Sequence, residues 1–444
     1  MRRSLTLLLL LLGIQMSFSQ DKPTSFTLQE AINYALQHNY SAINAERDIE
    51  DAQKQKWETI ASGLPQINGA ISYQNQLKQP VSLIPGELAG GAPGTFIPVV
   101  FGQKQSTSAT ATLSQQIFDG SYIVGVQATK TFIDYSANSK EKTALEVRKS
   151  VVEAYGNVLL AEESTSILEK NKAALEKNLN ETQKIFENGL TEEENVEQLQ
   201  ITLSSVTNQL KNAIRLKKIT VQMLNLVMGL ELDNPTKLAE DLDILTEKQI
   251  DFKLLESDLV LENNVDYKMA LNLNEQRTLE LKLEKSKALP KLNAFINFGY
   301  TAYSEDFDFL KKETDWFNSS ILGFDLNIPI FSSLRRSAST QRAKIALEKA
   351  KTQKTEAEES LRLSWENAKS EYILAIEQYQ TNKENLGLAE RIEQKNQVKY
   401  FEGLATSFEL RQAQTQLYAV QQEYLQSMID VINKKTALEL ILNN

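Results

Sequence analysis

The chain has 444 residues with 48 lysines and arginines, 58 aspartates and glutamates, and a formal net charge of −10. An acidic chain argues against a nucleic-acid partner, because phosphate contacts need a basic surface. Cysteine is absent and His38 is the only histidine, so disulfides, thiolate or histidine metal sites and histidine catalysis have almost no residues to use. We therefore expect no enzyme activity, no cofactor and no metal site, and we expect His38 to pack at a surface.

Residues 1–20 have the three parts of a secretory signal peptide. Two arginines come first, an apolar stretch runs from Leu5 to Ile14, and small and polar residues lead to a cleavage point near Ser19 or Gln20. The alternative is a buried N-terminal helix. No later stretch approaches the roughly 18 apolar residues of a membrane helix. The sequence predicts export from the cytoplasm, and membrane entry only as strands of a closed barrel.

Two long regions, residues 99–234 and 330–444, contain no proline. Apolar residues recur in them at alternating steps of four and three, beginning in one case with Val147, Val151, Ala154, Val158 and Ala161. This spacing is typical of a coiled-coil seam. We expect long helices at residues 121–187, 192–229, 333–400 and 405–442.

Two windows show a period of two instead. Residues 62–127 contain only four charged residues, Lys78, Glu87, Lys104 and Asp119, and residues 291–331 are rich in aromatic and polar side chains. The alternation predicts four strands in two hairpins. We place the strands near residues 66–77, 105–118, 291–303 and 317–331, with long tip loops at residues 78–104 and 304–315.

The two halves of the chain repeat each other. Asn39 through Pro65 aligns without a gap with Asn264 through Pro290, and Gly189-Leu190 matches Gly403-Leu404. Internal duplication of one helix-hairpin-helix unit is therefore the main architectural prediction. The expected parts are a signal peptide (1–20), a first repeat (21–230), an equatorial linker (231–264) and a second repeat (265–444).

Four strands cannot close a barrel, for which about eight is the practical minimum, and open strand edges are not tolerated in lipid. Several copies must therefore join around one axis, with their long helices forming a tube. One alternative is a secreted fibrous coiled-coil protein, structural or adhesive, with two β modules. A weaker one is a periplasmic enzyme hidden in residues 231–264. The charge-poor hairpins, and aromatic residues clustered near strand ends, favour the pore.

Several short motifs occur in a characteristic order, namely Thr27-Leu28-Gln29-Glu30-Ala31, Ala35-Leu36, Asn39, Leu64-Pro65, Leu289-Pro290, Tyr400-Phe401-Glu402-Gly403-Leu404 and Glu409-Leu410. With these motifs the chain resembles the TolC-like outer-membrane efflux proteins over nearly its whole mature length. The resemblance implies a mainly α-helical fold whose four strands contribute to a 12-stranded β-barrel of a homotrimer in outer-membrane lipid. It also implies a periplasmic α-barrel and an equatorial belt.

The same resemblance implies a passive exit duct in the bacterial outer membrane, for tripartite efflux or type I secretion. Such a duct extends into the periplasm and docks by its helical tips to an adaptor and an inner-membrane pump. The tips would be residues 186–191 and 400–405. Gly189 and Gly403 would adopt a left-handed backbone, and Leu190 and Leu404 would lie exposed for docking. Alternatively, the glycines are plain C-caps and the leucines are tucked between neighbouring tips.

The resemblance also implies a periplasmic gate, although the chain departs from the family pattern there. Tyr400 matches a tyrosine of the closed tip, but Ala405 replaces an arginine and Asn195 replaces an aspartate. The inter-helix salt bridge is therefore missing, and hydrogen bonds from Tyr400 and Asn195, or packing, must hold the tip. Glu409 would form an acidic ring that favours cations and has raised pKa values, while Gln412 stands at the second acidic position.

Overall fold

The computed structural model describes residues 25–443, and the expected signal peptide, residues 1–20, lies outside this range. The described chain is mainly helical, as the sequence predicted. In chain order its elements are β1 (Ser25–Phe26), α2 (Leu28–His38), α3 (Tyr40–Ala61), β2 (Gln66–Asn75), β3 (Val81–Pro85), η2 (Gly86–Ala89), β4 (Phe96–Val100), β5 (Gln105–Asp119), α4 (Gly120–Glu187), α5 (Glu193–Met228), β6 (Lys237–Leu238), α6 (Leu242–Lys248), α7 (Phe252–Leu255), η3 (Leu261–Asn263), α8 (Val265–Ser286), β7 (Lys291–Ser304), β8 (Trp316–Asn327), α9 (Arg335–Phe401) and α10 (Ser407–Leu442).

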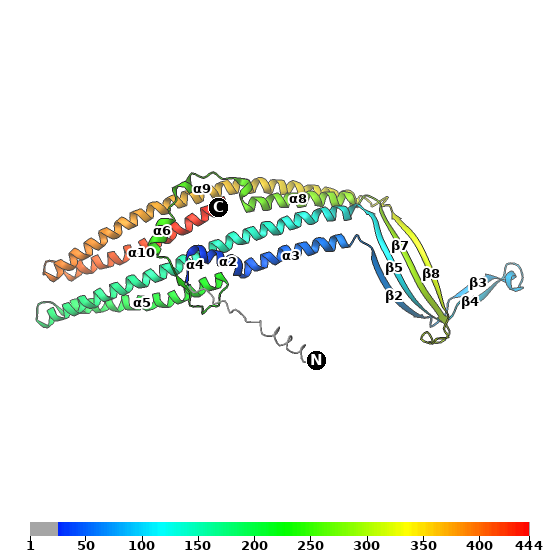
Figure 1. The fold of residues 1–444 in the computed structure, drawn as a ribbon, viewed down its shortest axis with the longest axis horizontal. Coiled ribbons are helices and arrows are strands. Elements are labelled where there is room, and N and C mark those ends of the chain that lie inside the picture. Colours follow the sequence, from blue (N-terminus) through cyan, green and yellow to red (C-terminus); the bar gives the residue numbers. More distant parts are fainter. Residues whose placement is uncertain (1–24, 444) are drawn as a thin grey trace, which may run out of the picture. The chain divides into compact units, whose positions relative to one another are not determined.

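The chain falls into two compact units. One contains the described residues up to Arg47 together with Ser139–Lys268 and the described residues from Ala357 onward, and the other contains Asp48–Asn138 and Met269–Glu356. The second unit holds an antiparallel sheet in the order β2-β5-β7-β8 (Figure 1). Within the described residues, β2 and β8 have a neighbouring strand on one side only. Each of these edges therefore presents a row of unpaired backbone N–H and C=O groups.

One face of this sheet is apolar. The register aligns Ile71 of β2 with Ala109 of β5, and Ala109 in turn with Tyr300 of β7. Because residues directly opposite each other on paired strands point to the same side of a sheet, these three side chains share one face. Ile71 is 84% exposed and Leu322 of β8 is 67% exposed. Most of the apolar face is thus left uncovered in the chain, and only the loop after β7 packs on part of it, at Tyr73.

The other face of the sheet is mostly polar, and side-chain hydrogen bonds cross between its strands. The hydroxyls of Ser72 and Ser108 lie 2.7 Å apart, and the Asn297 amide donates to the Thr112 hydroxyl at 2.7 Å. Every residue of β2 is exposed, so neither face of this strand is packed against another layer. A sheet with one mostly bare apolar face and one bare polar face is unlike the half-covered sheet of an ordinary globular domain.

Two details of the strands differ from the sequence prediction. The segment 78–104, expected to be a loop, contains the two-stranded ribbon β3–β4, in which Leu83 pairs with Pro98. Proline is tolerated in such a ribbon because no third strand needs its missing N–H. β8 ends at Asn327 instead of residue 331, in keeping with Pro329, which lacks a ladder donor.

Side-chain hydrogen bonds mark the starts of the two longest helices, α4 and α9. Asp119 accepts a hydrogen bond from the Ser121 N–H at 2.7 Å at the start of α4, and Ser332 accepts one from the Arg336 N–H at 3.4 Å before α9. α9 starts two residues later than expected, at Arg335, because Leu334 has a left-handed backbone with φ of 63°. α4 extends over 68 residues and α9 over 67. Among residues 25–443, no helix combines the length and apolar character needed to cross a membrane.

The core of the first unit is built from the middle of α4 and α9, the C-terminal parts of α5 and α10, and short elements such as α2 and α6. Tyr155 of α4, Leu224 of α5 and Met428 of α10 are fully buried in it. The segment 231–264, expected to be an equatorial linker, contains β6, α6, α7 and η3. Its residues Leu242 and Leu245 lie in the same core, so the segment packs as part of the fold.

Asn39 of the first repeat connects two helices. Its side-chain oxygen accepts hydrogen bonds from the N–H groups of Ser41 at 2.8 Å and Ala42 at 3.3 Å, which caps α3. Its amide nitrogen donates to the Val227 carbonyl in the last turn of α5 at 2.7 Å. One side chain therefore ties the start of a short helix to the end of a long helix.

Asn264 does the same in the second repeat. It accepts from the N–H groups of Asp266 at 2.9 Å and Tyr267 at 3.2 Å at the start of α8, and donates to the Ile441 carbonyl in the last turn of α10 at 3.0 Å. The duplication seen in the sequence thus extends to individual contacts.

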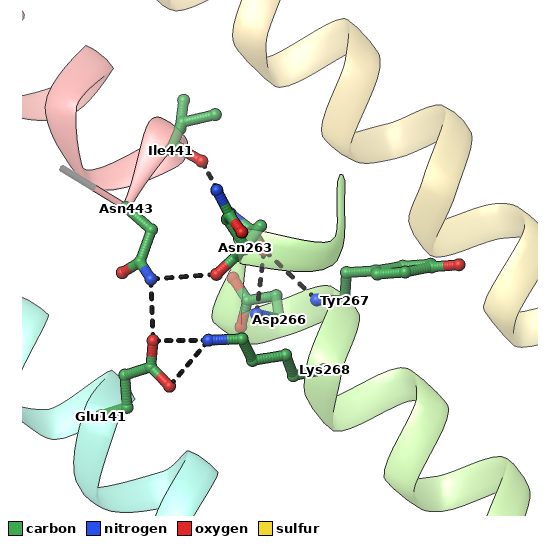
Figure 2. A network of polar contacts seen from close by, with 8 residues as sticks. Glu141, Asn263, Asp266, Tyr267, Lys268, Ile441 and Asn443 are labelled. Carbon is green, nitrogen blue, oxygen red and sulfur yellow. Dashed lines mark hydrogen bonds and ion pairs between the residues drawn. The ribbon is translucent and has the colours of Figure 1, made fainter. Parts of the chain in front are cut away.

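The second repeat has further polar contacts around this junction (Figure 2). The Asn443 amide donates to the Asn263 carbonyl at 2.9 Å and to Glu141 at 2.7 Å, and the Lys268 ammonium lies 2.8 Å from the same carboxylate. Burial alone would raise the pKa of Glu141, but the hydrogen bonds from Lys268 and Asn443 together lower it. The C-terminal end of α10 is thereby tied to α4 and to the residues preceding α8.

We predict that Asn264→Ala destabilises the protein by about 2 kcal/mol, because it removes a helix cap and takes the Asn264 donor away from the partly buried Ile441 carbonyl. Asn264→Ser keeps a capping hydroxyl but cannot reach Ile441, so its loss should be smaller. Thermal unfolding followed by circular dichroism at 222 nm checks this order. A wild-type melting temperature for Asn264→Ala would contradict the role given to this side chain.

Candidate functional site

Each pair of long helices ends in a tight turn built around a glycine. Gly189 lies between α4 and α5 with φ of 74°, and Gly403 lies between α9 and α10 with φ of 73°. The Leu190 N–H donates to the Ile185 carbonyl at 3.1 Å, and the Leu404 N–H donates to the Lys399 carbonyl at 2.8 Å. These bonds are those of a Schellman motif, in which a left-handed residue closes a helix end. Both glycines are therefore helix C-caps.

The leucine that follows each glycine points to solvent. Leu190 is 78% exposed and Leu404 is 74% exposed, so neither is covered within one chain. Nothing lies within 4 Å of the position where a Cβ would stand on Gly189 or Gly403. The glycines are needed for their backbone conformation, and space around them is open. Each tip thus exposes one leucine side chain, and no atom of the chain lies close to the glycine beside it.

Tyr400 and Asn195, two of the four gate residues expected from the sequence, contact different partners. The Tyr400 hydroxyl lies 3.3 Å from the Thr182 hydroxyl, which joins α9 to α4. The Asn195 amide donates to the Thr191 hydroxyl at 2.8 Å, and its oxygen accepts from the Ser407 hydroxyl, which joins α5 to α10. Tyr400 and Asn195 line the same small groove. The two helical hairpins are therefore held together by neutral hydrogen bonds at these positions.

Two further contacts between the hairpins were not predicted from the sequence. The Gln397 amide donates to Asn178 at 2.9 Å between α9 and α4, and the Arg411 guanidinium donates to Gln198 between α10 and α5. A guanidinium does cross between the hairpins, but it meets an amide instead of a carboxylate. For the contact between Tyr400 and Thr182 the sequence held one signal, because Thr182 is a polar residue at a seam position that is otherwise mostly apolar. In the structure Thr182 is fully buried.

Glu409 takes part in a capping box at the start of α10. Its carboxylate accepts from the Thr406 N–H at 2.7 Å and the Thr406 hydroxyl at 3.0 Å, while its own N–H donates to that hydroxyl at 3.2 Å. These hydrogen bonds from Thr406 lower the pKa of Glu409. Within one chain the shift is thus opposite to the rise expected from an acidic ring. Gln412, three residues further on, is exposed.

A second carboxylate lies between α9 and α10, behind the tip. Glu393 accepts a hydrogen bond from the Gln414 amide at 3.4 Å, and burial raises the pKa of Glu393 despite this bond. Burial, followed by the charge of Glu393, also raises the pKa of Tyr418 to about 12. The polar contacts of the tip therefore continue inward to a partly buried acid that the sequence analysis did not single out.

His38 ends α2 and packs locally. Its ring stacks on that of Tyr34 with centroids 4.0 Å apart, and its Nδ1 lies 2.9 Å from the Tyr34 carbonyl oxygen. Within residues 25–443, no group of three or more histidine, cysteine, aspartate or glutamate side chains is arranged to hold a metal ion. The sequence expectation of surface packing agrees with the position of His38.

Similar folds occur among solved outer-membrane proteins. The outer membrane protein VceC of Vibrio cholerae is 16% identical with a TM-score of 0.70, and the match covers 94% of this chain and 96% of VceC. The CmeC outer membrane channel of Campylobacter jejuni is 17% identical with a TM-score of 0.71, covering 96% and 90%. The MtrE outer membrane channel of Neisseria gonorrhoeae, solved in an open state, is 17% identical with a TM-score of 0.70, covering 94% and 89%.

No curated protein sequence matches the chain. The model of the outer membrane efflux protein family matches residues 31–230 and 257–444, which together make up most of its length. This match confirms the resemblance inferred from the sequence motifs and agrees with the expected location in the outer membrane. The chain belongs to the outer membrane efflux protein family.

Proposed function

We propose that three copies of this chain form the exit duct of a tripartite efflux or type I secretion system. The duct passes its cargo passively and carries out no catalysis. An adaptor protein and an inner-membrane pump supply the energy and the connection to the cytoplasm. The family match and the fold shared with outer-membrane channels support this function.

The four-stranded sheet is the observation that carries the proposal. Its apolar face is mostly bare, its polar face is bare, and the edges β2 and β8 are unpaired within the described chain. Three such sheets joined edge to edge make a closed barrel of 12 strands, with the apolar face toward lipid and the polar face toward a water-filled lumen. A secreted fibre, the alternative function, would have no use for a sheet with this division of faces.

The tips of the long helices are the proposed contact with the adaptor and the proposed gate. Exposed leucines at Leu190 and Leu404 offer apolar anchor points for docking. Tyr400 and Asn195 belong to the hydrogen bonds that hold the two hairpins together. Glu409 and Gln412 follow on an exposed face of α10, where three copies around an axis would bring three Glu409 carboxylates together.

We predict opposite outcomes for lysine at two adjacent positions of β2. Ile71→Lys places a charge on the proposed lipid face, where a lysine at the bilayer midplane costs about 2–4 kcal/mol, so detergent-resistant trimers should be lost. Ser72→Lys places the same charge in the lumen, so trimers should persist with altered ion selectivity. Gel mobility with and without heating, followed by planar-bilayer recording, measures both. A chain that stays monomeric and dissolved without detergent would refute the duct.

We predict that Leu404→Asp stops export while trimers still assemble, because a charge replaces an apolar docking contact on an open turn. Leu404→Met keeps the apolar character and should export normally. Dye efflux in cells that lack the native gene, with trimer content checked in the same membranes, measures the effect. Export at the wild-type level by Leu404→Asp would rule out docking at this leucine.

We predict that Glu409→Gln lowers the cation selectivity of the channel. Glutamine can replace glutamate in a capping box, so the start of α10 should be preserved while the charge is removed. The reversal potential in a salt gradient across a planar bilayer reports this change. The acidic ring would be excluded by a reversal potential equal to that of the wild type.

A further inference from the structure

The ribbon β3–β4 projects from the end of the sheet (Figure 1). Its far end is closed by η2 and by hydrogen bonds from the Gly86 N–H to the Thr95 carbonyl and from the Gly91 N–H to the Gly86 carbonyl, each 2.7 Å long. The segment is therefore a regular two-stranded hairpin with a defined register and a hydrogen-bonded turn.

Both faces of this ribbon are apolar. Leu83 and Phe96 lie on one face and are 64% and 66% exposed, and the cross-strand pair Ile84 and Ile97 lies on the other. Neither strand contains a charged residue. An isolated two-stranded ribbon is at best marginally stable in water, so an element of this composition needs a surface to cover it.

The topology indicates which surface is available. The ribbon follows directly from β2, one edge of the sheet, while β8, the other edge, begins at Trp316 directly after the loop 305–315. In an antiparallel pairing of β2 with β8 of another copy, the end of β2 lies beside the start of β8. The ribbon of one copy then rises next to the loop 305–315 of its neighbour.

The loop 305–315 exposes an apolar side chain. Phe307 and Phe309 pack on Tyr73 of their own chain, with ring centroids 5.4 Å and 6.0 Å from it. This contact fixes the loop and leaves the next residue, Leu310, 90% exposed. Leu310 on this fixed loop and Leu83 on the ribbon are both exposed apolar side chains, so each could cover the other in a contact between two copies.

The charges at the base of the ribbon also complement this loop. Lys78 and Lys104 flank the ribbon and are exposed, and within residues 25–443 neither ammonium has an ion-pair partner. The loop is predominantly acidic: its charged residues are Glu305, Asp306, Asp308, Glu313 and Asp315 against Lys311 and Lys312. Opposite charges at neighbouring edges favour the pairing of two copies.

We infer that the β3–β4 ribbon of each subunit packs on the loop 305–315 of the next subunit, with Leu83 against Leu310 and Lys78 beside Asp315. The inference rests on the proposed assembly of three copies. This contact would add to the pairing of strand edges, so that each subunit also contacts its neighbour beyond the end of the barrel.

The absence of cysteine from the chain allows a direct test by disulfide cross-linking. Lys78→Cys with Asp315→Cys tests the strand-edge pairing alone. Within one chain β2 and β8 are three strand spacings apart, about 14 Å, whereas a disulfide needs Cα atoms about 4.4–6.8 Å apart. A disulfide between these positions can therefore only join two copies.

Leu83→Cys with Leu310→Cys tests the ribbon itself. After mild oxidation of membranes, we expect both double variants to give cross-linked dimers and trimers on a non-reducing gel. Each of the four single variants should remain monomeric under the same conditions, and a reducing agent should collapse the ladders.

The two cysteine pairs distinguish a failure of the ribbon contact from a failure of the trimer. Cross-linking through residues 78 and 315 without cross-linking through residues 83 and 310 would overturn the ribbon contact and leave the trimer intact. It would mean that lipid or another protein covers the ribbon. Absence of both ladders would overturn the assembly on which the inference depends.

Discussion

The unpaired backbone groups along β2 and β8 are the constraint on which the rest of this structure depends. An N–H or C=O group without a partner costs several kcal/mol in hydrocarbon, where no water can replace the missing hydrogen bond. The sheet also leaves Ile71 84% exposed on a face that no helix or second sheet covers. In the proposed assembly such a sheet is one part of a larger closed surface, and identical chains are the simplest source of the remaining strands.

Because the chain is internally duplicated, it contributes two hairpins to the proposed closed barrel. Each repeat delivers one hairpin to the sheet, and each repeat fastens a short helix to the last turn of a long helix through an asparagine, Asn39 in one case and Asn264 in the other. In the proposed trimer, two similar repeats per chain place six similar units around the axis. The repeats are not identical, because the first hairpin alone carries the ribbon β3–β4.

The tips combine weak contacts between hairpins with firm contacts within each turn. Hydrogen bonds between neutral groups such as Tyr400 and Thr182 contribute about 0.5–1.5 kcal/mol each, so separating the hairpins there is a modest cost. The glycine turns and the capping box of Glu409 lie within single hairpins and need not change when the hairpins move apart. This division suits the proposed gate, in which the tips would move as rigid units.

Much of the fold followed from periodicity alone, since a spacing near 3.5 residues and a strict alternation are imposed by helix and strand geometry wherever one face is apolar. The long helices, the two hairpins, the duplication and the glycine turns of the tips could all be predicted from the residues. The folded chain was needed to see the pairing of β5 with β7, the ribbon β3–β4 and the contacts of Arg411 with Gln198 and of Glu409 with Thr406. These features depend on which residues distant in the chain come together, or on prolines being tolerated at an open edge, and no local pattern encodes either.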